Sequence, residues 1–381
     1  MISFNSPFIF MKIFFKILFI VFLLDFTLST LVLKKTTFWH HKNWDHKYWR
    51  IQSDIYHHDL MPYINVVENW GDKLEKKIIT NSLGFRDYEN KLVEKIPVKE
   101  RILLVGDSFI EGTGYDYEYT IGGLLQNKLG NKYEILNSAV GSYSPSIYFK
   151  KIQHFILEGY NFDHALVFLD VSDIFDELYI KFDDNENIIT DIETKNRNNY
   201  NKKIYAFTDF LKDNTISFRF LNILTDKTEI YKNHLKLRYK SSKFMNKSFL
   251  KTTMDDVMFY KMIHVDRGYW TFDEKRYAHV KEGLEQSERY LKKLFDLLNE
   301  NSIKSHLVIY PWPTQIHFGD TKHVKYWEKF AKKNNINFVS LYDNFSTNNS
   351  RKFILENFIY GDIHWNKKGT KIVFDEVNKL F

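Results

Sequence analysis

Three segments that lie far apart in the 381-residue chain carry the residue types that acyl transfer needs. Ser108 lies in the sequence GDSF at 106–109, directly after the apolar run at 101–105. A serine hydroxyl is a weak nucleophile at neutral pH, so it needs a base, and the base needs a partner that fixes its tautomer. Near the C-terminus, His364 and Asp362 can supply that base and that partner. These residues predict a Ser108, His364 and Asp362 triad.

The third segment, NSAVG at 137–141, ends in a glycine whose backbone N–H can stabilise a developing oxyanion.

Two alternatives to a catalytic triad remain open. The sequence GDSFIEGTG at 106–114 could be a turn that cradles a phosphate, although it lacks the Gly-Lys-Ser/Thr ending of a nucleotide P-loop. Asp362 and His364 could simply cap the last helix and present a surface histidine.

The surrounding elements would bring these segments together. Continuous apolar runs predict strands at 101–105, 133–136, 165–169 and 305–310. Amphipathic patterns predict helices at 120–129, 146–158 and 282–301, and a final helix after Lys368. Alternating strands and helices predict a mostly parallel sheet covered on both faces, which binds ligands where the loops leave the carboxyl ends of its strands.

These motifs resemble the SGNH (GDSL) hydrolase superfamily over most of residues 80–381. GDSF resembles its first block and NSAVG its second. The resemblance implies a three-layer α/β/α flavodoxin-like fold with a mostly parallel sheet. It also implies that Ser108 is the nucleophile and an oxyanion-hole donor, that Gly141 is the next donor, and that Asp362 and His364 complete the triad.

Two blocks depart from the family pattern. The stretch that matches the third block is Asp170-Val171-Ser172-Asp173, in which Ser172 replaces the usual asparagine and is expected to donate through its hydroxyl. One residue separates Asp362 and His364, where the family usually has two. This shorter spacing before a tryptophan is similar to envelope-glycan O-acetyl-modifying members, including alginate acetylation proteins. These members form a membrane-anchored branch of the family. The stretches at 81–86 and 310–315 also fit the pattern of that branch.

Two further charged residues are candidates for substrate binding. Arg86 is either a clamp for a substrate carboxylate or a buried ion-pair partner. Asp107 is a candidate because it precedes the nucleophile. The chemistry implies no metal or organic cofactor, and the absence of cysteine excludes thiolate zinc sites and cysteine nucleophiles.

The N-terminal region predicts a membrane anchor. Residues 8–33 are apolar apart from Lys12, Lys16 and Asp25, and they are long enough for one transmembrane helix. A removable signal peptide is the alternative, but no small-residue cleavage site follows. A carboxylate near the middle of a span is costly, so Asp25 should pair within a complex, be protonated or lie near an interface.

Residues 34–79 are predicted to form a juxtamembrane stalk, because they are rich in tryptophan and histidine. Five histidines in this stretch could be interpreted as a metal cluster, although nothing fixes their spacing on one element: His40, His41, His46, His57 and His58. The predicted hydrolase domain spans 80–381.

A helical insertion is predicted at about 176–275, acidic at its start and basic at 232–251, where seven Lys and Arg residues occur without an acid. Its basic part is either solvated or a face for anionic lipid or an acidic polysaccharide. The formal net charge of the chain, +6, argues against a nucleic-acid binder.

Together these features predict a membrane-anchored SGNH-type serine esterase that hydrolyses O-acetyl or other O-acyl esters of an envelope carbohydrate. Two alternatives are an O-acyltransferase with the same triad and a non-catalytic glycan-binding partner of a membrane acyltransferase. The resemblance places the domain outside the cytoplasmic membrane, whereas the lysines that flank the span favour the opposite orientation.

Overall fold

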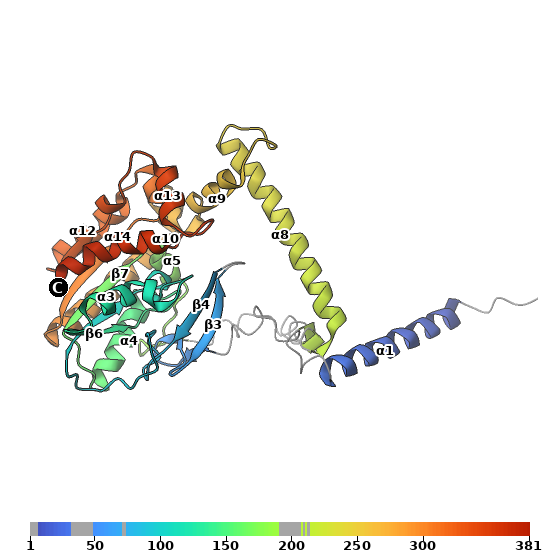
Figure 1. Cartoon of the computed structure of the whole chain (residues 1–381), viewed down its shortest axis with the longest axis horizontal. Coiled ribbons are helices and arrows are strands. Elements are labelled where there is room, and N and C mark those ends of the chain that lie inside the picture. Colours follow the sequence, from blue (N-terminus) through green and yellow to red (C-terminus); the bar gives the residue numbers. More distant parts are fainter. Residues whose placement is uncertain (1–6, 32–48, 71–73, 190–206, 209, 212–213) are drawn as a thin grey trace, which may run out of the picture. The chain divides into compact units, whose positions relative to one another are not determined.

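The computed structural model describes residues 7–31, 49–70, 74–189, 207–208, 210–211 and 214–381. The chain divides into two compact units (Figure 1). The first comprises Met1–Asp45 and Asp191–Lys240, and the second comprises His46–Thr190 and Ser241–Phe381. The second unit contains the sheet and the predicted triad and oxyanion-hole residues.

A five-stranded parallel sheet forms the centre of the second unit. Its strands are β5 (Glu100–Val105), β6 (Tyr133–Asn137), β7 (His164–Leu169), β8 (Lys304–Ile309) and β9 (Asn337–Ser340). They lie in the order β6-β5-β7-β8-β9, which is the 2-1-3-4-5 order of flavodoxin-like folds. The predicted α/β fold with a mostly parallel sheet is therefore confirmed. The strands are nearly continuous apolar runs, as expected where both faces of a sheet are buried.

Long helices flank this sheet in packed pairs (Figure 1). Helix α3 (Ile121–Leu129) packs on α14 (Lys367–Val377), and α4 (Pro145–Leu157) packs on α10 (Glu274–Glu300). Helix α12 (Lys322–Lys333) contacts β8 and β9. The shorter helices are α2 (Ser108–Glu111), η2 (Tyr117–Tyr119), α5 (Asp173–Glu177), α9 (Met254–Ile263), η3 (Asp266–Thr271), α11 (Pro313–Phe318), η4 (Asp343–Phe345), α13 (Ser350–Asn357) and η5 (Asn378–Leu380).

Two hairpins precede the sheet in the region that was expected to be a stalk. Strands β1 (Arg50–Ser53) and β2 (His57–Leu60) pair antiparallel, as do β3 (Asn65–Trp70) and β4 (Leu74–Ile79). An isolated hairpin is marginally stable in water, and these two bury side chains such as Leu60 and Ile78 in the domain core. The stalk expectation is therefore wrong for residues 49–70 and 74–79; residues 34–48 lie outside the described part of the chain.

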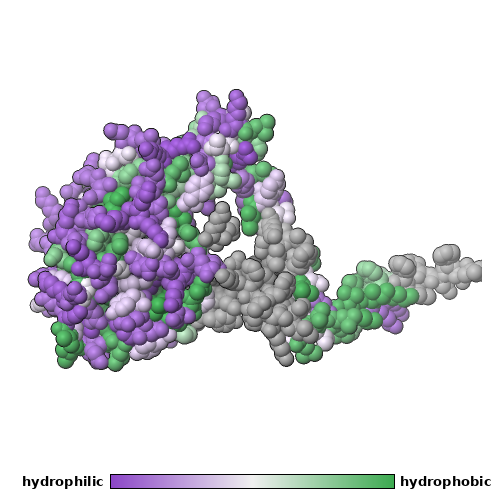
Figure 2. Space-filling view, in the orientation of Figure 1, coloured by the Kyte–Doolittle hydropathy of each residue, from purple (hydrophilic) through white to green (hydrophobic). Residues whose placement is uncertain are grey.

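The N-terminal helix α1 (Pro7–Leu31) belongs to the first unit. Its residues Met11–Leu31 are long and apolar enough to cross a membrane, with a mean hydropathy of 2.1, and a signal sequence would have the same properties. Hydrophobic residues gather along its surface (Figure 2). The structure therefore agrees with a candidate span and does not show which side of a membrane the domain occupies.

Asp25 has partners within the chain. Its carboxylate accepts hydrogen bonds from the backbone N–H groups of Ile216 at 2.9 Å and Ser217 at 3.1 Å, and from the Ser29 hydroxyl at 3.1 Å. Ile216 and Ser217 begin helix α8 (Ile216–Phe244), and the first N–H groups of a helix lack intrahelical acceptors. Asp25 therefore caps α8, an arrangement that also suits the positive end of the helix dipole.

The interval expected to be a helical insertion contains α8, α9 and η3 between β7 and α10. Two of its cations form ion pairs inside the second unit. Lys247 Nζ lies 2.8 Å from Asp256 Oδ2, and Arg267 lies 2.7 Å from Asp176. A lipid or polysaccharide face at 232–251 stays a prediction.

Candidate active site

Ser108 is the first residue of α2 and follows the end of β5 by three residues. Gly106 allows this sharp entry, since a Cβ atom there would lie 2.7 Å from the Ile110 side chain. Asp107 caps α2 by accepting the Phe109 N–H at 3.0 Å. Ser108 therefore occupies the carboxyl edge of the sheet, where ligands bind in open α/β folds.

His364 and Asp362 approach Ser108 from the loop between α13 and α14. His364 Nε2 lies 2.8 Å from Ser108 Oγ, and His364 Nδ1 lies 2.5 Å from Asp362 Oδ1. The same carboxylate oxygen accepts the His364 backbone N–H at 3.0 Å. The preceding residue, Gly361, has a φ of +74°, a left-handed conformation that suits glycine. The structure thus brings all three predicted triad residues together.

The electrostatics of this pair define the proton positions. Burial acts to raise the pKa of Asp362, but hydrogen bonds and charge from His364, with a hydrogen bond from Trp70, lower it to about 2. Asp362 is therefore a carboxylate at neutral pH, and the Nδ1–H of His364 donates to it. The Nε2 lone pair of a neutral His364 then faces the Ser108 hydroxyl, as a general base requires.

Trp70, at the end of β3, holds the other oxygen of Asp362. Its Nε1 donates to Asp362 Oδ2 at 3.0 Å, and its ring packs edge-on against His364 with centroids 5.4 Å apart. Sequence reasoning missed Trp70 because it placed this residue in the stalk. No local signal marks it, since the contact joins residues that are 292 positions apart.

Replacing Trp70 with phenylalanine should lower kcat by about ten- to a hundredfold and leave KM nearly unchanged. The change keeps a ring against His364 but removes one hydrogen bond to a charged group, which is worth about 1.5–3 kcal/mol. Steady-state kinetics of ester hydrolysis give kcat and KM separately for each variant. Trp327→Phe is the matched control, since the buried Trp327 Nε1 makes no hydrogen bond within the described residues. Equal kcat in both variants would contradict a role for Trp70.

Gly141 lies beside the nucleophile, but its N–H is already used. A Cβ atom at Gly141 would lie 3.5 Å from Ser108 Cβ, while the Gly141 N–H donates to Glu111 Oε2 at 2.7 Å. Glu111 is buried and forms ion pairs with Arg50 at 2.7 Å and Lys76 at 3.6 Å. Burial would raise the pKa of Glu111, but the two cations and the Gly141 N–H outweigh it and lower the pKa. The expectation of a free oxyanion donor at Gly141 is therefore not met in this structure.

The first hairpin also holds the carbonyl of Gly141. His58 Nε2 lies 2.9 Å from the Gly141 oxygen, so this nitrogen must carry the donated proton. His58 Nδ1 then accepts from His57 Nδ1 at 2.7 Å. Burial lowers the pKa of His58 to about 4, which keeps the ring neutral. Among the five histidines considered for a metal cluster, His57 and His58 lie in the described part of the chain, and their nitrogens make these hydrogen bonds instead.

The other two expected oxyanion donors are Ser108, whose backbone N–H is available, and Ser172, whose backbone N–H is already used. Ser108, as the first residue of α2, has a backbone N–H without an intrahelical acceptor, so it is available. Ser172 is buried at the start of α5, and its backbone N–H donates to Asp170. Within the described residues, no hydrogen bond joins Ser172 to Ser108 or His364, so its role stays a prediction.

Arg86 and Asp107 are not placed to bind substrate. Arg86 is fully buried, and its guanidinium donates to the carbonyls of Glu111 and Gly112 at 2.6 Å each, and of Tyr115. It therefore holds the loop after α2 rather than clamping a ligand. Asp107 is also buried, and its carboxyl faces Ser108 and the Phe109 N–H. Both substrate-binding expectations are corrected, because neither side chain reaches solvent.

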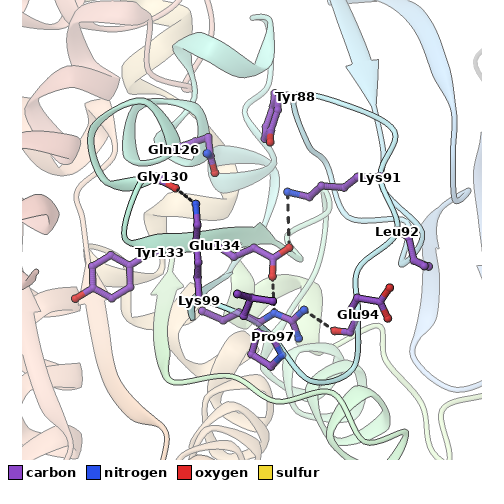
Figure 3. A pocket seen from close by; sticks show the side chains of 12 residues that line it. Tyr88, Lys91, Leu92, Glu94, Pro97, Lys99, Gln126, Gly130, Tyr133 and Glu134 are labelled. Atoms are coloured by element: carbon purple, nitrogen blue, oxygen red, sulfur yellow. Dashed lines mark hydrogen bonds and ion pairs between the residues drawn. The ribbon is translucent and has the colours of Figure 1, made fainter.

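A separate pocket of about 280 Å³ lies at the opposite end of β5 and β6 (Figure 3). Its cations already have partners. Lys99 Nζ donates to the Gly130 carbonyl at 2.6 Å, and Arg101 pairs with Glu134 at 2.7 Å. The pocket adjoins residues that begin the two strands, whereas Ser108 follows the end of β5, so it does not serve the triad.

No protein-family model and no curated protein sequence matches the chain. Two esterases are among the solved structures that resemble it. The psychrotrophic esterase EstA from Pseudoalteromonas sp., in a structure inhibited by monoethylphosphonate, is 11% identical with a TM-score of 0.34. The acetyl xylan esterase AlAXEase is 12% identical with a TM-score of 0.36. Each match covers 74% of this chain and 98% of the other. Similarity at this level does not extend to a shared substrate or mechanism.

Proposed function

We propose that the protein is a serine-dependent ester hydrolase in which Ser108, His364 and Asp362 act as a catalytic triad. One observation carries this proposal, namely the continuous chain of contacts from Ser108 Oγ through both ring nitrogens of His364 to the Asp362 carboxylate. A Ser–His–Asp array at the carboxyl edge of a parallel sheet is the arrangement that activates a serine hydroxyl.

In the proposed reaction, Ser108 Oγ attacks the ester carbonyl while His364 Nε2 takes the hydroxyl proton. Asp362 stabilises the imidazolium that forms, and the Ser108 N–H donates to the oxyanion. His364 then returns its proton to the leaving alcohol, which leaves an acyl group on Ser108. Water activated by His364 releases the acid. A sugar hydroxyl in place of that water would give the O-acyltransferase alternative, with the same acyl-enzyme.

The proposed substrate class is an O-acylated carbohydrate of the cell envelope, such as an O-acetyl ester. This part of the proposal rests on the sequence resemblance to SGNH hydrolases and on the D-x-H-W arrangement at 362–365. The candidate span at Met11–Leu31 supports a membrane-anchored form. The location of the domain outside the cytoplasmic membrane rests on the sequence resemblance alone. A non-catalytic partner of a membrane acyltransferase is the alternative, and it would need no reactive serine.

A covalent probe separates these possibilities. The full-length protein, in detergent, is treated with a fluorophosphonate, and its peptides are analysed by mass spectrometry. We expect labelling at Ser108, together with hydrolysis of a chromogenic acetate ester that the probe abolishes. A folded protein that is neither labelled nor able to hydrolyse the ester would overturn the triad proposal and favour the non-catalytic alternative. Labelling without hydrolysis would favour the transferase.

A further inference from the structure

The Ser108 hydroxyl has two close neighbours, but it has one proton to donate. Ser108 Oγ lies 2.8 Å from His364 Nε2 and 3.2 Å from Asp107 Oδ2. His364 Nδ1 donates to Asp362, so the neutral ring must accept the Ser108 proton at Nε2. The contact with Asp107 is then a hydrogen bond only if Asp107 Oδ2 carries a proton itself.

We propose that Asp107 is a neutral carboxylic acid that donates its proton to Ser108 Oγ and so directs the serine's own proton toward His364. Asp107 is thus a positioning residue that acts through the nucleophile. Its catalytic consequence rests on the proposed function, whereas its protonation does not.

Three buried carboxyl groups lie together at this point. One oxygen from each of Asp107, Asp170 and Asp173 lies within 4.8 Å of the others. Within the described residues, no Lys or Arg forms an ion pair with any of them, and the Arg267 side chain, which acts electrostatically on Asp107 and Asp170, is paired with Asp176 at 2.7 Å. Like charges this close and this buried cannot all be ionised, so the cluster holds at least one proton.

The hydrogen bonds indicate where that proton lies. Asp170 accepts Trp312 Nε1–H at 2.8 Å and the Asp173 N–H at 3.2 Å. Asp173 Oδ2 accepts the Tyr148 hydroxyl at 2.7 Å and the Asp170 N–H at 3.0 Å. These donors suit oxygens that act as acceptors.

In Asp107 the two oxygens differ. Oδ1 accepts the Phe109 N–H at 3.0 Å and the Tyr310 hydroxyl at 3.3 Å, whereas Oδ2, within the described residues, contacts Ser108 alone. Two oxygens of the cluster can hold a proton without displacing a donor, Asp107 Oδ2 and the buried Asp173 Oδ1, which has no hydrogen-bond partner in the described part of the chain. Of these, Asp107 Oδ2 is the one with an acceptor for that proton, Ser108 Oγ. Burial, followed by the charge of Asp170, raises the pKa of Asp107 well above its ordinary value, and the same two causes raise the pKa of Asp173, so the hydrogen bonds and not these shifts assign the proton to Asp107.

This arrangement has a consequence for pH dependence. While Asp107 is protonated, Oγ accepts from Asp107 and donates to His364, and Asp107 keeps its proton when Ser108 attacks. Once Asp107 ionises, its carboxylate competes with His364 for the Ser108 proton. Ester hydrolysis should therefore decline as the pH rises through the pKa of Asp107.

Asparagine at position 107 tests the direction of the hydrogen bond. Its amide can donate to Ser108 Oγ from the Oδ2 position while its oxygen keeps the Phe109 N–H, but it cannot titrate. We expect Asp107→Asn to lower kcat/KM by less than about tenfold and to lose the alkaline decline, while Asp107→Ala loses about a hundredfold or more. Asp176→Asn, a nearby acid paired with Arg267, should keep the alkaline decline. A loss in Asp107→Asn as large as in Asp107→Ala, with both variants folded, would overturn the proposal.

Infrared spectroscopy provides a readout that needs no activity. The protonated Asp107 should give a carboxylic acid C=O band in the wild-type protein near neutral pH. This band should shift in Ser108→Ala, which removes its hydrogen-bond acceptor, and disappear in Asp107→Asn. If the band behaves in this way but no ester is hydrolysed, the proposed function fails and the protonation of Asp107 stands. The absence of such a band in the wild type would overturn the inference itself.

Discussion

Ser108→Ala should lower kcat for ester hydrolysis by about 10⁴-fold or more, because within the described residues Ser108 is the one hydroxyl that hydrogen-bonds His364 Nε2. His364→Ala should lose a comparable amount, since the hydroxyl then lacks the base 2.8 Å away. The two losses should not add. Residues that act as one unit lose their function together, so the double variant should resemble either single variant. Initial rates with a chromogenic acetate ester measure all three.

The chain offers a matched control for these variants. Ser350 Oγ lies 2.9 Å from His317 Nδ1, a second serine–histidine contact in which, within the described residues, His317 has no carboxylate hydrogen-bond partner. Ser350→Ala should leave the rate within about twofold of wild type, because it forms no part of the proposed triad. Additive losses in the double variant, or a similar loss in Ser350→Ala, would contradict the triad.

Lys151→Met should destabilise the domain by about 3–5 kcal/mol, because it leaves a buried carboxylate without its cation. Lys151 is 1% exposed, and its Nζ lies 2.8 Å from Asp59 Oδ1 and 2.9 Å from the Ser138 carbonyl. Asp59 belongs to β2, and Ser138 lies in the segment that ends at Gly141. The loss should therefore loosen both the first hairpin and the second block of the site. Urea unfolding of the domain measures the change.

Two further variants identify the cause of that loss. The double variant Asp59→Asn with Lys151→Met should recover much of the stability, since no unpaired buried charge remains. Lys371→Met removes a Lys–Asp pair at the surface, where Lys371 and Asp375 are each 56% exposed, and should change the stability by less than about 1 kcal/mol. If Lys151→Met behaved like Lys371→Met, the buried pair would not be what holds the hairpin.

Strands and long helices could be read from local pattern. The predicted strands at 101–105, 133–136, 165–169 and 305–310 correspond to β5, β6, β7 and β8, and the helices at 120–129, 146–158 and 282–301 correspond to α3, α4 and α10. A strand buried on both faces must be apolar throughout, so it stands out in any window of the sequence. Strand β9, only four residues long and partly exposed, carries no such signal and was missed.

The triad residues were nominated by their type and spacing and by the resemblance to SGNH hydrolases, because an activated serine needs a base and an acid and few positions combine them. What surrounds these residues depended on packing between distant parts of the chain. Trp70 meets Asp362, Glu111 takes the Gly141 N–H, and Asp25 caps α8, each across a long sequence separation. Such contacts follow from which surfaces are buried together, and no local periodicity encodes that choice. Composition suggested a stalk at 34–79, whereas the fold buries the hairpins between residues 49 and 79 beside the site, because two-stranded sheets require a core to be stable.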